Sequence, residues 1–183
     1  MSPRHRKSAP TLWLMTDERV DAGTLLAAAG RLPKGRAGIV FRHYRTDPQD
    51  RRALFEALRA IAKRRRLSLL LAGSVREAAA WRADGAHGQG IRRSIRPMLR
   101  SAPAHDVREA LAARGADLCF VSPLFPTRSH PGARALGRVR FAALARRVDA
   151  PVMALGGVSR AHRQVWRSVG ADGWAAIDGL TGL

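Results

Sequence analysis

Cysteine and long apolar runs are both scarce in this sequence. Cys119 is the one cysteine among 183 residues, so no intramolecular disulfide can form, and its place in the apolar run LCFVS predicts a buried strand residue and a reducing compartment. No apolar run approaches the roughly 20 residues that cross a bilayer. The basic residues 1–11 lead straight into a strand-like run, without the apolar core of a signal peptide. We therefore expect a cytoplasmic protein with no membrane partner.

Acidic residues are also scarce, because 14 Asp and Glu stand against 33 Lys and Arg, a formal net charge of +19. Clustered cations attract the phosphates of nucleic acid, and the clusters here are residues 63–66 and the group Arg92, Arg93 and Arg96. However, arginines occur in every helix-like segment, and the four Trp residues are dispersed instead of lying among the basic clusters as base-stacking platforms. The sequence therefore favours partners other than nucleic acid.

From residue 12 onward, short apolar runs alternate with helical patterns. The expected strands are residues 12–17, 37–44, 67–73, 85–88, 97–105 (interrupted by Pro103), 116–125, 151–157 and 173–180. The expected helices include residues 20–30, which stop at Gly30, and segments that begin after the capping residues Asp47, Ser74, Asp106 and Ser159. Parallel neighbouring strands need such helical crossovers.

Eight strand candidates in this alternation predict a (β/α)₈ TIM barrel, formed by one domain of residues 12–183 after a basic tail of residues 1–11. Barrels of this kind usually need about 250 residues, so the loops must be short. The sequence stops directly after the eighth strand, which leaves no room for a last helix and predicts an exposed apolar flank that a homodimer could cover. An open doubly wound sheet is the structural alternative.

The carboxyl ends of the strands are where function is expected in either architecture. Gly156 and Gly157 follow the seventh strand, where they let backbone N–H groups approach an anion, although a tight turn alone would also explain them. Arg42 shares one face of the second strand with Val40. An inward arginine needs an anion or a carboxylate, and Asp17 is the candidate for a purely structural ion pair.

The loop SPLFPTRSHPGARALG, residues 122–137, follows the sixth strand. Thr127, Ser129 and nearby N–H groups can donate hydrogen bonds to phosphate oxygens, while Arg128 and Arg134 can neutralise them. His130 can donate when it is protonated. The alternative interpretation is a surface excursion between a strand and a helix.

The segments LWLMTD, GADLCFVSPLFPTRSHPGARALG, PVMALGGV and GADGWAA together resemble the thiamine phosphate synthase/TenI family, in order over roughly residues 12–180. The resemblance implies a barrel that joins hydroxymethylpyrimidine pyrophosphate to thiazole phosphate with Mg²⁺ and releases pyrophosphate. It places the pyrimidine pyrophosphate at Arg42. It implies a thiazole-phosphate site made of Thr127, Arg128, Ser129, Gly156, Gly157, Ile177 and Asp178.

Several positions depart from the family pattern. Ala72 and Gly73 stand where the family has the Asn-Asp pair that binds substrate and Mg²⁺, and the second metal-binding Asp, after the fourth strand, is not evident. Mg²⁺ usually needs one or two carboxylates. The resemblance therefore leaves Mg²⁺ possible but without its family ligands.

The phosphate loop departs as well. His130 replaces a lysine, and Asp178 replaces a serine, where a carboxylate would repel phosphate unless an arginine pairs with it. The TenI histidine falls at Pro123, with His130 as the nearest substitute. We therefore expect a synthase-like transferase with Arg42 and His130 as catalytic candidates. The alternatives are a TenI-like thiazole tautomerase and a non-catalytic binder of small phosphorylated ligands.

Overall fold

The computed structural model describes residues 9–88, 98–129, 132 and 134–182. Eight parallel strands form a closed barrel in sequence order, with β8 pairing back to β1. The strands are β1 Leu12–Met15, β2 Ala37–Phe41, β3 Ser68–Ala72, β4 Gly85–His87, β5 Leu99–Ala104, β6 Leu118–Val121, β7 Val152–Ala154 and β8 Gly173–Ala176. The predicted (β/α)₈ barrel is confirmed, and the closed sheet excludes the open alternative.

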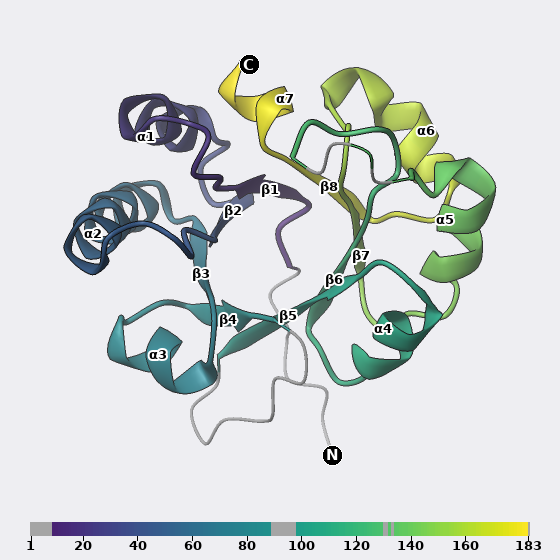
Figure 1. Ribbon diagram of the computed structural model, residues 1–183, viewed down its shortest axis with the longest axis horizontal. Helices are drawn as coiled ribbons and strands as arrows, with labels where there is room; N and C mark the ends of the chain where they lie inside the picture. The colour runs from purple at the N-terminus through teal and green to yellow at the C-terminus, as the bar shows by residue number, and fades with distance from the viewer. Residues whose placement is uncertain (1–8, 89–97, 130–131, 133, 183) are drawn as a thin grey trace.

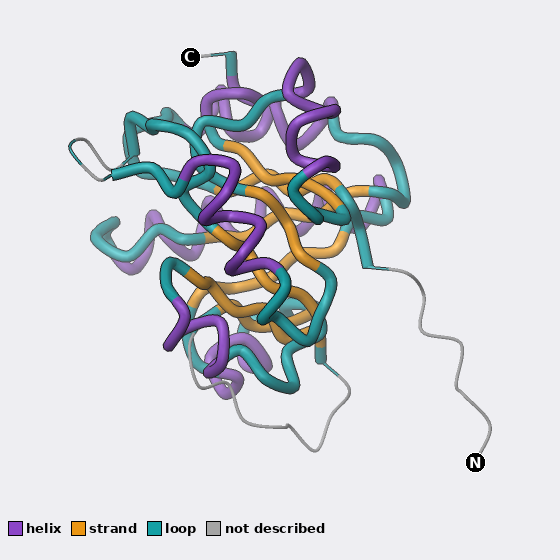
Figure 2. The backbone as a smooth tube through the Cα atoms, turned by 90° about the vertical axis from the view of Figure 1, so that its right-hand side faces the viewer, coloured by secondary structure: helices purple, strands orange, loops and turns teal. Residues whose placement is uncertain are grey.

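Helices surround the ring of strands, and Figure 2 shows the strands enclosed by them from the side. In Figure 1, α1 to α3 lie on one side, α4 to α6 on the other, and α7 between α1 and α6. The helices are α1 Ala22–Arg31, α2 Pro48–Arg65, α3 Val75–Ala80, α4 Val107–Ala112, α5 Gly137–Ala145, the 3₁₀ helix η1 Arg160–His162, α6 Arg163–Ser168 and α7 Asp178–Thr181.

Three of the predicted helix caps are confirmed by their hydrogen bonds. The side chains of Asp47, Ser74 and Asp106 each accept a hydrogen bond from a first-turn backbone N–H, at 2.9, 3.1 and 2.8 Å. These bonds satisfy N–H groups that have no partner inside the helix. Ser159 begins η1 differently, because its own N–H donates to Nδ1 of His162 at 3.1 Å.

The barrel interior is filled by large apolar side chains. Trp13 is fully buried, its Nε1 donates to the carbonyl of Pro10 at 2.7 Å, and its ring meets that of Phe120 edge-on at 5.7 Å. A Cβ at Gly38 would lie 2.2 Å from the Trp13 ring, so this glycine makes room for the tryptophan. The indole closes the lower part of the barrel, and Phe120 lies above it toward the carboxyl ends of the strands.

Alternation along β2 follows the prediction. Val40 belongs to the interior cluster, whereas Ile39 and Phe41 pack outward in the cluster that β1 to β4 form with α1, α2 and α3. Arg42 comes directly after the strand, on the same side as Val40. The side-chain period of two therefore carries Arg42 into the mouth of the barrel.

At the opposite end of the barrel, three aspartates connect neighbouring strands in the same way. Asp84, Asp117 and Asp172 immediately precede β4, β6 and β8. Each carboxylate accepts a hydrogen bond from a backbone N–H near the start of the preceding strand, at 2.8, 2.9 and 2.8 Å. Each aspartate N–H also donates to the carbonyl of that same residue. The lower ends of β3–β4, β5–β6 and β7–β8 are thus joined by two hydrogen bonds each.

Two local predictions were wrong. Helix α1 continues through Gly30 to Arg31, because Gly30 does not adopt the left-handed conformation of a helix-ending glycine. The residue that ends the helix is Leu32, which is followed by Pro33. Strand β5 continues through Pro103. Ser101 of β5 pairs with His87, where β4 ends, so the missing N–H of Pro103 removes no hydrogen bond with β4.

The segment after β8 also differs from the expected strand of residues 173–180. The strand ends at Ala176, and α7 adds four helical residues in place of a full last helix. All residues of β8 are buried, and Leu180 packs against two of the apolar clusters. The described residues therefore show no exposed apolar flank beside β8, and self-association stays a prediction without that support.

The structure describes only the first of the two basic clusters. Residues 63–66 end α2, where Arg66 adopts a left-handed conformation and cations are favourable at the carboxyl terminus. Arg92, Arg93 and Arg96 lie outside the described residues. Within the part of the chain that the structure describes, no helix is long and apolar enough to cross a membrane.

Candidate functional site

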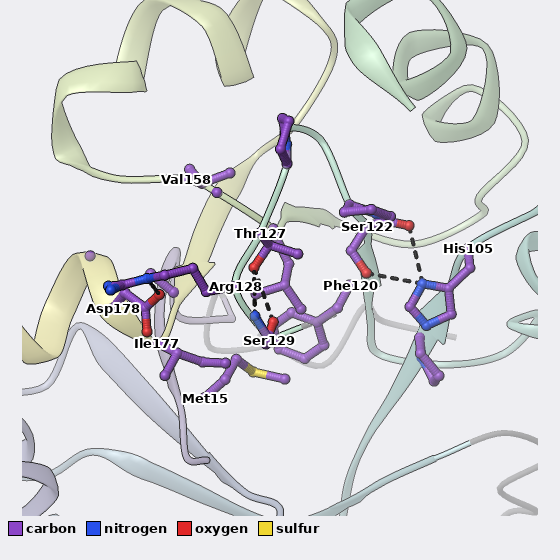
Figure 3. A pocket seen from close by; sticks show the side chains of 18 of the residues that line it. Met15, His105, Phe120, Ser122, Thr127, Arg128, Ser129, Val158, Ile177 and Asp178 are labelled. Carbon is purple, nitrogen blue, oxygen red and sulfur yellow. Dashed lines mark hydrogen bonds and ion pairs between the residues drawn. The ribbon is translucent and has the colours of Figure 1, made fainter. Parts of the chain in front are cut away.

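A cavity of about 850 Å³ opens at the carboxyl ends of the strands. Its lining includes eight of the nine predicted site residues: Arg42, Thr127, Arg128, Ser129, Gly156, Gly157, Ile177 and Asp178. His130, the ninth, lies outside the described residues. The structure therefore gathers at one mouth residues that follow β2, β6, β7 and β8. Figure 3 shows Thr127, Arg128 and Ser129 of the loop after β6 together with Ile177 and Asp178.

The loop after β6 lies against the turn after β7. The backbone N–H of Leu124 donates to the carbonyl of Leu155 at 2.9 Å, and that of Phe125 donates to the carbonyl of Gly156 at 3.0 Å. The hydroxyls of Thr127 and Ser129 lie 3.0 Å apart at the rim. Two loops that the sequence separates by about thirty residues thus form one wall.

Gly156 and Gly157 are required at this junction by backbone conformation and by space. Their φ values are +88° and +62°, a region that favours glycine. A Cβ would lie 2.5 Å from Pro123 at the first position and 2.4 Å from the carbonyl oxygen of Pro126 at the second. The glycines therefore have a structural reason to be there. Their N–H groups form no hydrogen bond with another described backbone group, which leaves them able to bind an anion.

Arg42 forms the structural contacts that the sequence offered as one of two interpretations. Its Nε donates to the carbonyl of Thr16 at 3.2 Å, and its Nη2 lies 3.6 Å from a carboxylate oxygen of Asp17. Burial lowers the pKa of the guanidinium below its ordinary value, although an arginine still keeps its proton. Arg42 thus remains a positive charge at the cavity, held by β1.

Asp17 is the carboxylate at the end of this contact. Burial would raise its pKa, but hydrogen bonds from Arg19 and the charges of Arg19 and Arg42 outweigh burial, so the pKa of Asp17 is lowered. Arg19 Nε lies 2.9 Å from Asp17. Asp17 is therefore an anion shared by two arginines.

Asp178 pairs with arginines, an arrangement to which the sequence gives two interpretations: a carboxylate neutralised beside a bound phosphate, or an ion pair that takes the place of the phosphate. Nε of Arg128 donates to Asp178 Oδ2 at 3.0 Å, and Nη2 of Arg19 lies 3.6 Å from Oδ1. Figure 3 shows Arg128 and Asp178 side by side at the rim. The carboxylate is thus neutralised by residues of the protein.

Two histidines at the cavity were not selected from the sequence. His105 Nδ1 lies 3.1 Å from both the carbonyl oxygen and the hydroxyl of Ser122. Because a carbonyl oxygen only accepts, Nδ1 is the donor in this contact, and in the neutral imidazole with that tautomer Nε2 is an acceptor. The sequence signal was available, since His105 follows β5 and Ser122 follows β6, at the ends of strands where function is expected.

His87 is the second histidine and differs in its surroundings. It is buried, and its Nδ1 lies 2.9 Å from the hydroxyl of Ser101. Burial lowers the pKa of His87 to about 3, with smaller contributions from the charges of Arg42 and His105. His87 is therefore neutral at physiological pH and serves as a polar part of the cavity floor.

Comparison with known proteins assigns the chain to a family. A family model described as thiamine monophosphate synthase matches residues 12–180. The chain belongs to the thiamine monophosphate synthase family. The thiamine-phosphate synthase of Chloroflexus aurantiacus is 30% identical over 181 residues, which cover 92% of this chain and 84% of that protein.

One further relative is much longer than this chain, and another is similar in its solved structure. The thiamine biosynthesis bifunctional protein ThiED of Geobacter sulfurreducens is 27% identical over 187 residues, 97% of this chain but only 38% of that protein. The chain thus spans less than half of that relative. The structure of thiamine phosphate pyrophosphorylase from Pyrococcus furiosus superposes with a TM-score of 0.76 at 24% identity, covering 94% of this chain and 88% of that one. That likeness confirms the fold.

The thiamine monophosphate synthase family implies a Mg²⁺ site, and the donor groups of the described residues do not fit one. No group of three or more His, Cys, Asp or Glu among the described residues could hold a metal. The sequence between Gly88 and Met98 contains no Asp or Glu. Asp178 is the one carboxylate among the described cavity residues, and Arg128 and Arg19 already contact it. Mg²⁺ prefers carboxylate oxygens, and this mouth offers arginines instead.

Proposed function

We propose that this member of the thiamine monophosphate synthase family is a transferase that joins a pyrimidine pyrophosphate to a thiazole phosphate. One observation carries the proposal: the loops after β6, β7 and β8 meet at a cavity that offers hydroxyls, backbone N–H groups and arginines. Loops after strands seven and eight are a common phosphate site of barrels. The thiamine-phosphate synthases among the relatives support a role in thiamine biosynthesis.

The thiazole phosphate would lie against Thr127, Ser129 and Gly157. The hydroxyls can donate to its oxygens, and the N–H of Gly157 is a further donor. Met15 and Phe120 provide an apolar surface beside this position (Figure 3). A flat heteroaromatic ring with one phosphate therefore matches both the polar rim and the apolar floor.

The pyrimidine pyrophosphate would lie toward Arg42 and Arg134, which also line the cavity. In the transfer, the thiazole nitrogen forms a bond to the methylene carbon of the pyrimidine, while the bond from that carbon to the pyrophosphate oxygen breaks. The pyrophosphate leaves with the electron pair. Fixed positive charges stabilise such a leaving group where charge develops, and we assign this role to Arg42.

The test is to incubate the purified chain with both phosphorylated precursors, with and without Mg²⁺, and to measure thiamine phosphate and pyrophosphate. We expect both products, and we expect Arg42→Gln to lower the rate by 100-fold or more, the size found for a lost electrostatic donor. Arg108→Gln, an exposed change outside the cavity, is the matched control. Binding of both precursors without any product would exclude the transferase.

A thiazole tautomerase is the second candidate, and the geometry of His105 favours it. A tautomerase needs a group that removes and returns a proton, and histidine is the most frequent such group. Nε2 of His105 is an acceptor because Nδ1 is fixed by Ser122. Figure 3 shows this pair across the cavity from Arg128 and Asp178, with Phe120 between. The ring of a phosphorylated thiazole held at the rim would extend toward His105.

The tautomerase is tested with His105→Asn and His105→Gln. The Asn amide can keep the donor to the Ser122 carbonyl but has no group at the position of Nε2. We therefore expect Asn to retain binding of thiazole phosphate and to lose isomerisation of a dearomatised thiazole phosphate, followed by its ultraviolet absorbance. Wild-type isomerisation in His105→Asn would contradict this role, and binding without either reaction would leave the chain a phosphate-ligand-binding protein.

A further inference from the structure

Five charged residues of alternating sign form a series of ion pairs across the mouth of the barrel. Arg128 contacts Asp178 at 3.0 Å, Asp178 contacts Arg19 at 3.6 Å, Arg19 contacts Asp17 at 2.9 Å, and Asp17 contacts Arg42 at 3.6 Å. This series of ion pairs connects the loop after β6 to the end of β2 through residues that follow β8 and β1. Three cations and two anions leave a net charge of +1 in it.

The two carboxylate oxygens of Asp178 have unequal contacts within this series. Oδ2 accepts the hydrogen bond from Arg128, whereas Oδ1 is buried and has no hydrogen-bond partner among the described residues, with only the longer ion pair to Arg19. The Arg128 side chain is 63% exposed and that of Asp178 is 23% exposed. Arg128 can therefore turn toward a ligand, and Asp178 has a second arginine close by when it does.

Asp178 also lies where the three phosphate-site loops meet. It begins α7, and the next residue, Gly179, is packed so closely on the turn after β7 that a Cβ would lie 2.7 Å from the Val158 carbonyl oxygen. Asp178 and Gly157 both line the cavity with Arg128. A phosphate bound there would face both the arginine and the carboxylate.

We propose that Asp178 is a specificity-determining residue that competes with the phosphate of the ligand for Arg128 and so sets how tightly the mouth holds a dianion. The proposal rests on the phosphate site of the proposed function. A ligand phosphate binds when it takes Arg128 from Asp178, whose carboxylate then pairs with Arg19. The carboxylate weakens binding by occupying the arginine and by repelling the ligand.

The size of the effect depends on the ligand charge. At the dielectric constant of water, a unit charge and a dianion roughly 6 Å apart repel enough to change a binding constant about tenfold, and a monoanion about threefold. Removing the charge of Asp178 should therefore strengthen the binding of a phosphate monoester more than that of a phosphodiester. A structural role of Asp178 alone would not produce this difference.

The experiment is calorimetric titration of the full chain with inorganic phosphate, methyl phosphate and dimethyl phosphate at one pH. Asp178→Asn keeps the shape and removes the charge, and Asp178→Ser is the second variant. We expect the loss of repulsion alone to make both variants bind the two dianions about tenfold, and dimethyl phosphate about threefold, more tightly than the wild type, and the release of Arg128 to add to these gains. Asp149→Asn, an exposed change outside the cavity with the same charge difference, should stay within about twofold.

A double-mutant cycle identifies Arg128 as the contested group. In an Arg128→Gln background, Asp178→Asn should keep only the smaller gain from reduced repulsion, because no arginine is left to release. Equal or weaker phosphate binding in both Asp178 variants, with binding in the wild type, would overturn the inference and leave the phosphate site intact. Absence of phosphate binding in every folded variant, wild type included, would overturn the phosphate site and this inference together.

Discussion

Gly157→Ala should damage the cavity wall, because this glycine lies where two loops cross. An alanine Cβ at this position would lie 2.4 Å from the carbonyl oxygen of Pro126 and 2.8 Å from Cβ of Phe125. The first contact is with backbone, which cannot rotate away as a side-chain end can. The loop after β6 would have to move away from the turn after β7.

The expected cost has two parts. Alanine at the φ of +62° costs about 1 kcal/mol, the usual penalty for a side chain in the left-handed region. The forced loop movement adds about 1–3 kcal/mol, as overpacking does elsewhere. Together these lower the free energy of unfolding by about 2–4 kcal/mol.

Gly170→Ala is the matched control, since Gly170 has a φ of +86° and nothing lies within 4 Å of a Cβ built there. It carries only the conformational cost of about 1 kcal/mol. The extra cost of about 1–3 kcal/mol should therefore separate the melting temperatures of the two variants by about 2–12 °C, at roughly 2–4 °C per kcal/mol in a chain of this size. Gly157→Ala should also weaken phosphate binding, whereas Gly170→Ala should not. Equal melting temperatures and equal phosphate affinities in the two variants would refute the close-contact reasoning.

Three further predictions concern the barrel and its helices. Burial lowers the pKa of His87 to about 3, so the unfolded chain binds a proton below about pH 6.5 that the folded chain does not. The free energy of unfolding should therefore fall as the pH drops from about 6.5 toward 3. His87→Asn should flatten this pH dependence, measured by urea unfolding at several pH values. Identical slopes would contradict the neutral buried imidazole. Phe120→Ala should lower the free energy of unfolding by about 3–5 kcal/mol in the same assay, because the ring is buried against Trp13 and His87. A decrease of less than about 1 kcal/mol would mean that the barrel interior collapses into the space left by the ring. Asp47→Ala should cost about 1 kcal/mol by removing the cap of α2, while Asp50→Ala, in the same first turn without the capping bond, should cost less.

Much of the barrel was predictable because strands and helix starts depend on short-range patterns. The apolar runs gave all eight strands in order, and capping residues such as Asp47 marked the starts of helices. Strand ends were less predictable. Pairing with neighbours decides them, so Pro103 remains within β5 and residues after Ala176 leave β8.

In the candidate site, too, the residues could be located from the sequence, whereas the contacts that depend on the fold could not. The cavity residues could be located because the barrel brings all strand ends to one mouth, and the pair of Arg42 with Asp17 was one of two stated options. The partner of Asp178 could be required by charge but not identified, since Arg128 lies 50 residues away in sequence. Arg19 gave no signal, because an exposed arginine after a strand looks like any surface cation. His105 was not selected although it follows a strand, because its contact with the Ser122 carbonyl oxygen depends on the fold.

The aspartates before β4, β6 and β8 divide the barrel into two-strand units. Each aspartate closes one unit by hydrogen bonds to the start of the preceding strand, and the same Ala-Asp dipeptide precedes all three strands. The repeat covers three of the four strand pairs, because Arg36 and not an aspartate precedes β2. It also indicates where the chain could be rearranged: a circular permutant opened between two units, for example between α5 and β7, keeps every aspartate with the strand it joins.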